Sequence, residues 1–228
     1  MKKILLMLSI TVLLSTLLVV SGCGKEKAPA VGADVDLFSL LPDNAAGNNA
    51  AGVITVNFKK FAQQELFDKM IKGEKEKPDK PGKVFKDYQD FVDKTGIDPK
   101  KDIHAIAVGL YGKLGGDQEP DVALVINLNY TKDTLLALMK EHGTDFTEET
   151  HNNVEVLKFK DDKGKDMAVS FLSENLIAGG CPDCLLKVID LYKETGQSIM
   201  ANAQMKPHLE KLKANVLASF VFGIPEEA

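Results

Sequence analysis

The residues best suited to chemistry are two cysteines, Cys181 and Cys184, in the run Gly-Cys-Pro-Asp-Cys. A short apolar segment precedes them and a helical pattern comes after them, so Cys181 is expected at a helix N-terminus. Unpaired backbone N–H groups and the helix dipole at that position would lower the pKa of the Cys181 thiol and make it a better nucleophile. The pair could serve thiol–disulfide exchange, form a passive disulfide, or bind a metal.

The pair resembles the redox motif of thioredoxin-like proteins, which implies exchange chemistry. In those proteins the motif lies early in the chain and usually follows an aromatic residue, whereas here it lies late and follows Gly179-Gly180. A passive disulfide or two idle thiols is therefore the favoured interpretation, and redox chemistry is the second. Metal binding ranks last, because there is no second cysteine pair and no ligand spacing among the four histidines, His104, His142, His151 and His208.

The third cysteine, Cys23, ends a different kind of segment. Lys2 and Lys3 precede an apolar run from Ile4 to Val20, which is the layout of a secretory signal. Small residues then lead directly into the cysteine, an order that resembles the lipobox of bacterial lipoproteins. The resemblance implies that the signal, residues 1–22, is removed and that Cys23 receives diacylglycerol and a further fatty acid. A membrane-spanning helix is the alternative, but the run is at the short limit for one.

The segment after Cys23 indicates how the protein is held. Residues 23–36 have no periodicity and little to bury, which predicts a flexible tether. The residue after the cysteine is Gly24 and not aspartate, and by resemblance to the sorting rule of two-membrane bacteria this favours the outer membrane. We therefore expect a protein anchored by lipid to the cell membrane, facing the periplasm or the exterior.

Composition limits the partners. The chain of 228 residues is 44% hydrophobic and 27% charged, as in an ordinary globular protein. Its formal net charge of −5 becomes −7 once Lys2 and Lys3 leave with the signal, and this acidic balance argues against a nucleic-acid partner. No cofactor is expected.

The elements that must position these residues follow from periodicity. Strands are predicted at residues 52–58, 103–111, 121–129, 154–159, 167–172, 176–178 and 216–222. Helices are predicted at residues 59–72, 85–95, 131–142, 182–193 and 205–213, and polar loops at 44–49 and 73–83. Several strands are joined by short connections, which require antiparallel neighbours. We expect a single α+β domain over residues 37–228, with a mainly antiparallel sheet and helices on one face.

Two stretches look like copies of one unit, Ala51 to Lys72 and Asp121 to Glu141, because each runs from an apolar strand into an amphipathic helix. The segment that begins at Val216 looks like the opening of a third copy, so the chain is expected to lack a C-terminal repeat.

A family resemblance rests on three groups of residues. They are Leu40–Asp43 with Ala51–Asn57, then Thr95–Ile103, and Leu176–Gly179 before a helix. These segments resemble a bacterial family of secreted or lipid-anchored proteins known as domain of unknown function three-three-five-two. The family implies repeated strand and helix units and supplies no catalytic residues. The chain departs from its pattern in the insertion at residues 44–49, in its early end and in the paired cysteines.

Two other segments carry only a superficial signal. The glycine-rich run from Gly109 to Gly116 leads into a strand and not into a helix, so it is a poor phosphate cradle. The acidic run from Asp161 to Asp166 has a lysine at a ligand position of a calcium loop and lacks the distal glutamate. Both are predicted to be hairpin turns.

Together these features predict a lipid-anchored cell-envelope protein that is non-enzymatic and binds an envelope protein or a small ligand. The alternative is a periplasmic thiol–disulfide exchange protein that uses Cys181 and Cys184. A third possibility, a lipid carrier, would need a continuous apolar cavity between the sheet and the helices.

Overall fold

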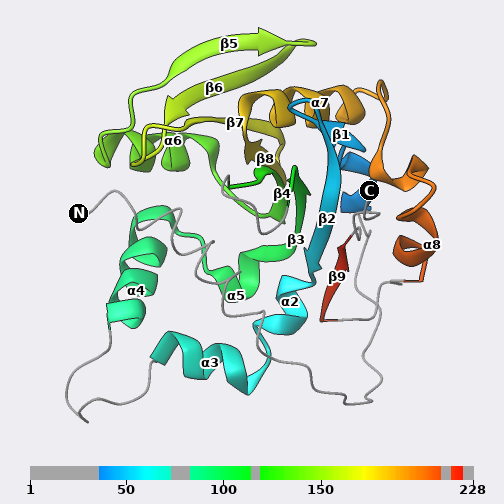
Figure 1. The fold of residues 1–228 in the computed structure, drawn as a ribbon. Coiled ribbons are helices and arrows are strands. Elements are labelled where there is room, and N and C mark those ends of the chain that lie inside the picture. Colours follow the sequence, from blue (N-terminus) through cyan, green and yellow to red (C-terminus); the bar gives the residue numbers. More distant parts are fainter. Residues whose placement is uncertain (1–35, 73–82, 114–118, 212–216, 223–228) are drawn as a thin grey trace.

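The computed structural model describes residues 36–72, 83–113, 119–211 and 217–222. Within this part of the chain, nine strands form one sheet (Figure 1). The strands are β1 (Asn44–Ala45), β2 (Asn48–Val56), β3 (Ile103–Tyr111), β4 (Asp121–Leu128), β5 (Thr147–His151), β6 (Val154–Lys160), β7 (Asp166–Ser173), β8 (Leu176–Gly180) and β9 (Ala218–Phe222).

The strand order is β1-β2-β3-β4-β8-β7-β6-β5, and β9 pairs with β2 on the side away from β3. All of these pairings are antiparallel. The prediction of an α+β fold with a mainly antiparallel sheet is therefore confirmed.

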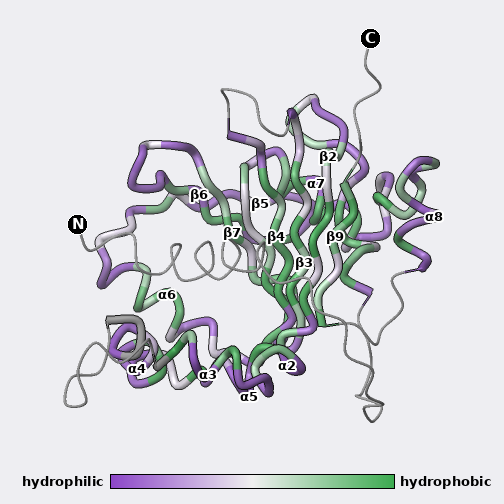
Figure 2. The backbone as a smooth tube through the Cα atoms, turned by 60° about the horizontal axis from the view of Figure 1, so that its bottom comes forward, coloured by the Kyte–Doolittle hydropathy of each residue, from purple (hydrophilic) through white to green (hydrophobic). Residues whose placement is uncertain are grey.

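Seven α-helices and two short 3-10 helices accompany the sheet in the described residues. They are η2 (Leu37–Leu40), α2 (Phe58–Phe61), α3 (Glu65–Lys72), α4 (Lys83–Thr95), α5 (Pro99–Asp102), α6 (Lys132–Glu141), α7 (Pro182–Tyr192), η3 (Ile199–Ala201) and α8 (Lys206–Leu209). Figure 2 shows apolar residues concentrated along the central strands, while α5 is largely hydrophilic and α3 carries both apolar and hydrophilic residues.

The main core lies between α7 and the sheet. Helix α7 packs against β4, β7 and β8, and its Leu185, Val188 and Ile189 are fully buried there. The sheet contributes small residues beneath the helix, including Ala123 and Ala178. Small side chains on the strands let the helix approach closely, and its larger residues fill the space.

A second core involves the other set of alternating strand residues. Val53 of β2 belongs to the core under α7, whereas its neighbour Ile54 packs with the phenylalanines Phe58, Phe61 and Phe67 of α2 and α3. These three rings contact one another edge to face, with centroids 5.5–5.8 Å apart. Helices therefore pack against both faces of the sheet, and the prediction that they lie on one face is not confirmed.

Several predicted elements need correction. The expected loop at residues 44–49 is a hairpin, in which β1 turns into β2 through Ala46 and Gly47 at positive φ (51° and 77°). The expected helix at 59–72 is two helices, α2 and α3, because Phe58 and Phe61 of the first and Phe67 of the second converge on one cluster. The helix predicted at 205–213 shortens to α8, and strand β5 was not predicted at all.

The segment before β1 is fixed by a buried tyrosine of β3. The Tyr111 hydroxyl donates a hydrogen bond of 3.0 Å to the carbonyl oxygen of Pro42, and both residues are buried. Burial raises the pKa of Tyr111 far above its ordinary value, and the charge of Asp43 raises it further. The phenol therefore stays protonated and remains a donor across the physiological pH range.

We predict that Tyr111→Phe lowers the free energy of unfolding by about 1–3 kcal/mol, because the Pro42 carbonyl would lose its buried donor. Urea denaturation followed by circular dichroism would measure it. Tyr192→Phe, at a half-buried tyrosine of α7, is the matched control and should cost clearly less. Equal midpoints for wild type and Tyr111→Phe would contradict the role given to this bond.

Candidate functional site at the start of helix α7

The site is the junction between β8 and α7. Cys181 is the N-cap residue of α7, Pro182 occupies the first helical turn, and Asp183 places a carboxylate there. Proline suits this position because its missing N–H is not needed, and an acidic residue is stabilised by the helix dipole. The strand and helix were both predicted at this position, and the sequence itself explains the sharp change between them.

Gly180 makes the junction possible. Its φ is 140°, and a Cβ atom there would lie 1.9 Å from the carbonyl oxygen of Val122 on the neighbouring strand β4. The backbone of β8 thus approaches β4 too closely for any side chain. The Cys181 N–H donates to that same carbonyl at 3.0 Å, so the entry to the helix is tied to the sheet.

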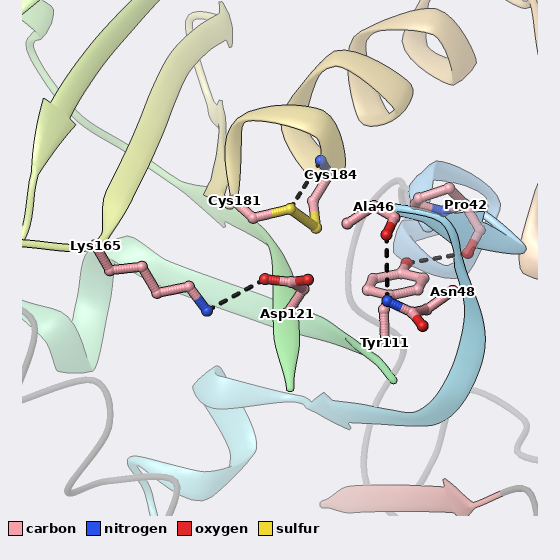
Figure 3. Close-up of a disulfide and its surroundings, with 8 residues drawn as sticks. All are labelled: Pro42, Ala46, Asn48, Tyr111, Asp121, Lys165, Cys181 and Cys184. Atoms are coloured by element: carbon pink, nitrogen blue, oxygen red, sulfur yellow. Dashed lines mark hydrogen bonds and ion pairs between the residues drawn. A yellow bond between two sulfur atoms is a disulfide. The ribbon is translucent and has the colours of Figure 1, made fainter. Parts of the chain in front are cut away.

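The structure joins Cys181 and Cys184 in a disulfide, with an S–S distance of 2.10 Å (Figure 3). The Sγ atom of Cys181 also accepts a hydrogen bond of 3.0 Å from the backbone N–H of Cys184. This contact caps the helix at the N-terminus expected for Cys181. A sulfur thus occupies the place that a serine or aspartate oxygen takes in most helix caps.

Burial restricts what this disulfide can do. Cys181 is 6% exposed and Cys184 is 0% exposed, and both belong to the core under α7. Thiol–disulfide exchange requires an attacking thiolate to reach one of the sulfurs. Of the two cysteines, Cys181 borders open space, and that space decides which reagents could approach.

The space beside Cys181 is a hollow of about 320 Å³. It is lined by Ala46, Asp121, Lys165, Asp166, Cys181, Pro182 and Asp183. The hairpin between β1 and β2, which the sequence did not predict, supplies one wall through Ala46. Lys165 pairs with Asp121 at 3.2 Å, as Figure 3 shows, and Lys160 pairs with Asp166 at 2.6 Å.

The charges around this hollow are partly balanced. Three carboxylates, Asp121, Asp166 and Asp183, line it, and two of them are ion-paired, Asp121 with Lys165 and Asp166 with Lys160. Nearby negative charge disfavours a deprotonated thiol and repels anionic thiol reagents. The helix N-terminus would instead favour the deprotonated thiol, so these two local influences on the pKa of a Cys181 thiol are opposed.

A second hollow, of about 940 Å³, lies where β4 leads into α6. Its lining comes from that corner and from the end of β7: Asn129, Tyr130, Thr131, Lys132, Phe171, Ser173, Glu174 and Asn175. The rings of Tyr130 and Phe171 lie 5.6 Å apart, and the Tyr130 hydroxyl donates to the Ser173 carbonyl. Burial raises the pKa of Tyr130, so the hydroxyl stays a donor.

The second hollow combines one cation with two aromatic rings. Lys132, its one cation, pairs with Glu155 at 2.6 Å and lies 5.5 Å from the Phe171 centroid. Two rings with flanking amides and hydroxyls could hold a small polar ligand. Sequence reasoning missed the site because Tyr130 and Phe171 are far apart in the chain. The one feature of the sequence that could have indicated the site is that Tyr130 and Phe171 both lie near the ends of predicted strands.

The remaining candidates are dispersed. In the described residues, no group of three or more histidine, cysteine or acidic side chains is arranged to hold a metal ion. His151 contacts Asp190 of α7 at 2.6 Å and so ties the turn between β5 and β6 to that helix. Asp161 accepts hydrogen bonds from the backbone N–H groups of Lys163 and Lys165, as in a hairpin turn.

The N-terminal predictions concern Cys23, the signal at residues 1–22 and the tether after it; they lie outside the described residues, except Asp36 at the tether's end. Across the described ranges, no helix has the length and apolar character needed to span a membrane.

We predict that Cys181→Ser with Cys184→Ser lowers the free energy of unfolding by about 2 kcal/mol, the chain-entropy contribution of a short disulfide loop. Urea midpoints, measured with and without reductant, would show it. Wild-type protein unfolded in reductant should match the double variant. An identical midpoint for oxidised wild type and double variant would show that the disulfide does not stabilise the fold.

Comparison with protein-family models, with curated proteins and with solved structures finds no match to this chain. The resemblance to domain of unknown function three-three-five-two therefore stays a prediction.

Proposed function

We propose that this chain is a lipid-anchored protein of the cell envelope, held at the membrane through Cys23, and that it is a non-enzymatic binding module. The observation that carries the proposal is the disulfide between Cys181 and Cys184, buried in the main core. Disulfides form and persist outside the reducing cytoplasm. A core that includes one suits the exported location that the signal and Cys23 predict, at the outer membrane where there are two membranes.

The binding role is assigned to the hollow at the corner between β4 and α6. It offers rings, amides and hydroxyls, whereas its lysine is already paired with Glu155. This chemistry suits a small polar ligand or a side chain of an envelope protein. Nucleic acid is an unsuitable partner for a body with a net negative charge.

We also propose that the fold is built from repeated strand–helix units. We take β2 with α2 and α3, and β4 with α6, as two copies of one strand–helix unit, with β9 as the first strand of a third. The resemblance to domain of unknown function three-three-five-two supports this view, because that family implies such repeats.

The anchor can be tested by mass spectrometry of the protein from intact membranes. We expect the mature chain to begin at Cys23 and to carry fatty acids, and Cys23→Ala to abolish both features. Cys181→Ser with Cys184→Ser is the matched control, since it changes the other two cysteines and should leave the anchor intact. An unmodified residue at position 23, or a retained signal, would overturn the anchor.

The binding role needs its own experiment. Affinity capture from native membranes would compare wild type with the double variant Asn175→Ala plus Phe171→Ala, which alters the hollow. We expect a ligand or protein to be recovered with wild type only. Recovery of the same molecule with both forms would remove the hollow from the proposal.

A second function, thiol–disulfide exchange, is favoured by one observation: Cys181 is the N-cap of α7 and borders the smaller hollow. We expect a passive disulfide, because both cysteines are buried. The reduction potential of the pair should then lie below about −300 mV. A higher potential, together with a Cys181 pKa well below the ordinary value of about 8.5, would instead establish exchange chemistry.

A further inference from the structure

The two ends of the sheet differ in chemistry. At one end, β5 carries Glu148, Glu149 and His151, and charged residues are a common protection of an exposed strand edge. At the other end, β9 has the sequence Ala-Ser-Phe-Val-Phe, with no charge and no proline. Only β2 pairs with β9 among the described strands, and none of the others lies along its outer edge.

The exposed surface of β9 is aromatic. Phe220 is 37% exposed and Phe222 is 44% exposed, and their rings are stacked with centroids 6.5 Å apart. Phe222 lies directly over Gly52 of β2, where a Cβ atom would come within 2.5 Å of the ring. The two rings are therefore held in place on the sheet and form a preorganised apolar surface at its edge.

The backbone of β9 presents hydrogen-bonding groups outward. The N–H of Asn57 donates to the carbonyl oxygen of Leu217 at 2.9 Å, so Leu217 directs its groups toward β2. In an antiparallel strand, the backbone N–H and C=O groups of successive residues point alternately to one neighbouring strand and to the other. Ser219 and Val221 therefore also bond toward β2, while Ala218, Phe220 and Phe222 direct their N–H and C=O groups to the free edge.

The order Phe-Val-Phe reads the same in both directions, which makes the edge complementary to itself. We propose that β9 pairs antiparallel with β9 of a second copy of this chain, with Val221 opposite Val221 of the other copy. In this register Phe220 of each chain faces Phe222 of the other, and each such pair exchanges two backbone hydrogen bonds. Cross-strand aromatic pairs stabilise a sheet by about 0.2–1 kcal/mol each.

Charge disfavours the other symmetric arrangement of the sheet ends, although Glu149 is paired with Lys158 at 2.6 Å within its own chain. The same operation applied to β5 would place Glu149 opposite Glu149, and like charges directly opposite each other are destabilising. Pairing β9 with β5 of another copy would be head-to-tail and would give a larger ring or an open filament. The two-fold pairing through β9 instead closes after two chains.

The interface is small, because in this register only Phe220, Val221 and Phe222 of each β9 lie opposite each other. A weak dimer is therefore expected for free protein. Confinement on one membrane would raise the effective concentration of the chains and favour pairing. The pairing itself does not require the lipid anchor, so a failure of either proposal leaves the other testable.

Disulfide trapping in membranes tests the register. In the full chain, Val221→Cys places two cysteines at a non-hydrogen-bonded cross-strand pair, where the Cβ atoms are close enough for a disulfide. Mild oxidation should give a covalent species of twice the chain mass. Glu149→Cys, at the corresponding centre of β5, is the matched control and should yield at least ten-fold less. The parent chain reports any background from the native cysteines.

Charge substitutions test the chemistry of the pairing in the Val221→Cys chain. Phe220→Lys with Phe222→Lys should reduce the dimer yield at least ten-fold, because it places like charges opposite each other. Phe220→Glu with Phe222→Lys should restore it, since each glutamate then faces a lysine of the other copy. Urea midpoints of the two variants would verify that both are folded.

Three results would overturn the proposal. They are no dimer from Val221→Cys, equal yields from the two edges, or a product joined to a different protein. A double-lysine variant that dimerises as well as the parent would also reject the stated register.

Discussion

The fold depends on the contact between helix α7 and the sheet. Leu185, Val188 and Ile189 are fully removed from solvent there, and burial of each such side chain stabilises the folded state by roughly 1.5–3 kcal/mol. The contact is fixed at both ends of the helix. The disulfide and the bond from Cys181 to Val122 hold its start, and the contact between Asp190 and His151 holds its last turn.

This contact explains why Cys181 and Cys184 are buried and poorly accessible to thiol reagents. The cysteines hold the start of α7 on the sheet, and both are buried. The binding sites that we propose lie elsewhere, at the corner between β4 and α6 and at the edge of β9. Both places combine aromatic surface with polar groups, and both lie where strands end or remain unpaired.

The sequence predicted the elements whose patterns are local. Strand β3 was predicted with the bounds observed, residues 103–111, and α7 to within one residue, because an apolar run or a helical face identifies each. Strand β5 was missed because its sequence, Thr-Glu-Glu-Thr-His, is polar; hydrogen bonds to β6 impose its conformation. The turn at Ala46 was missed because alanine gives no signal for positive φ. The hollow beside Phe171 depends on strand pairing across the chain, which no local pattern encodes.

The pairing of β9 with β2 joins residues from opposite ends of the described chain, with Val53 beside Val221. During synthesis one edge of β2 must wait for a segment that emerges more than a hundred residues later. Among the described strands, the sheet therefore stays incomplete until β9 has been made. For the exported protein that we propose, this late pairing favours passage through a translocation channel as an extended chain.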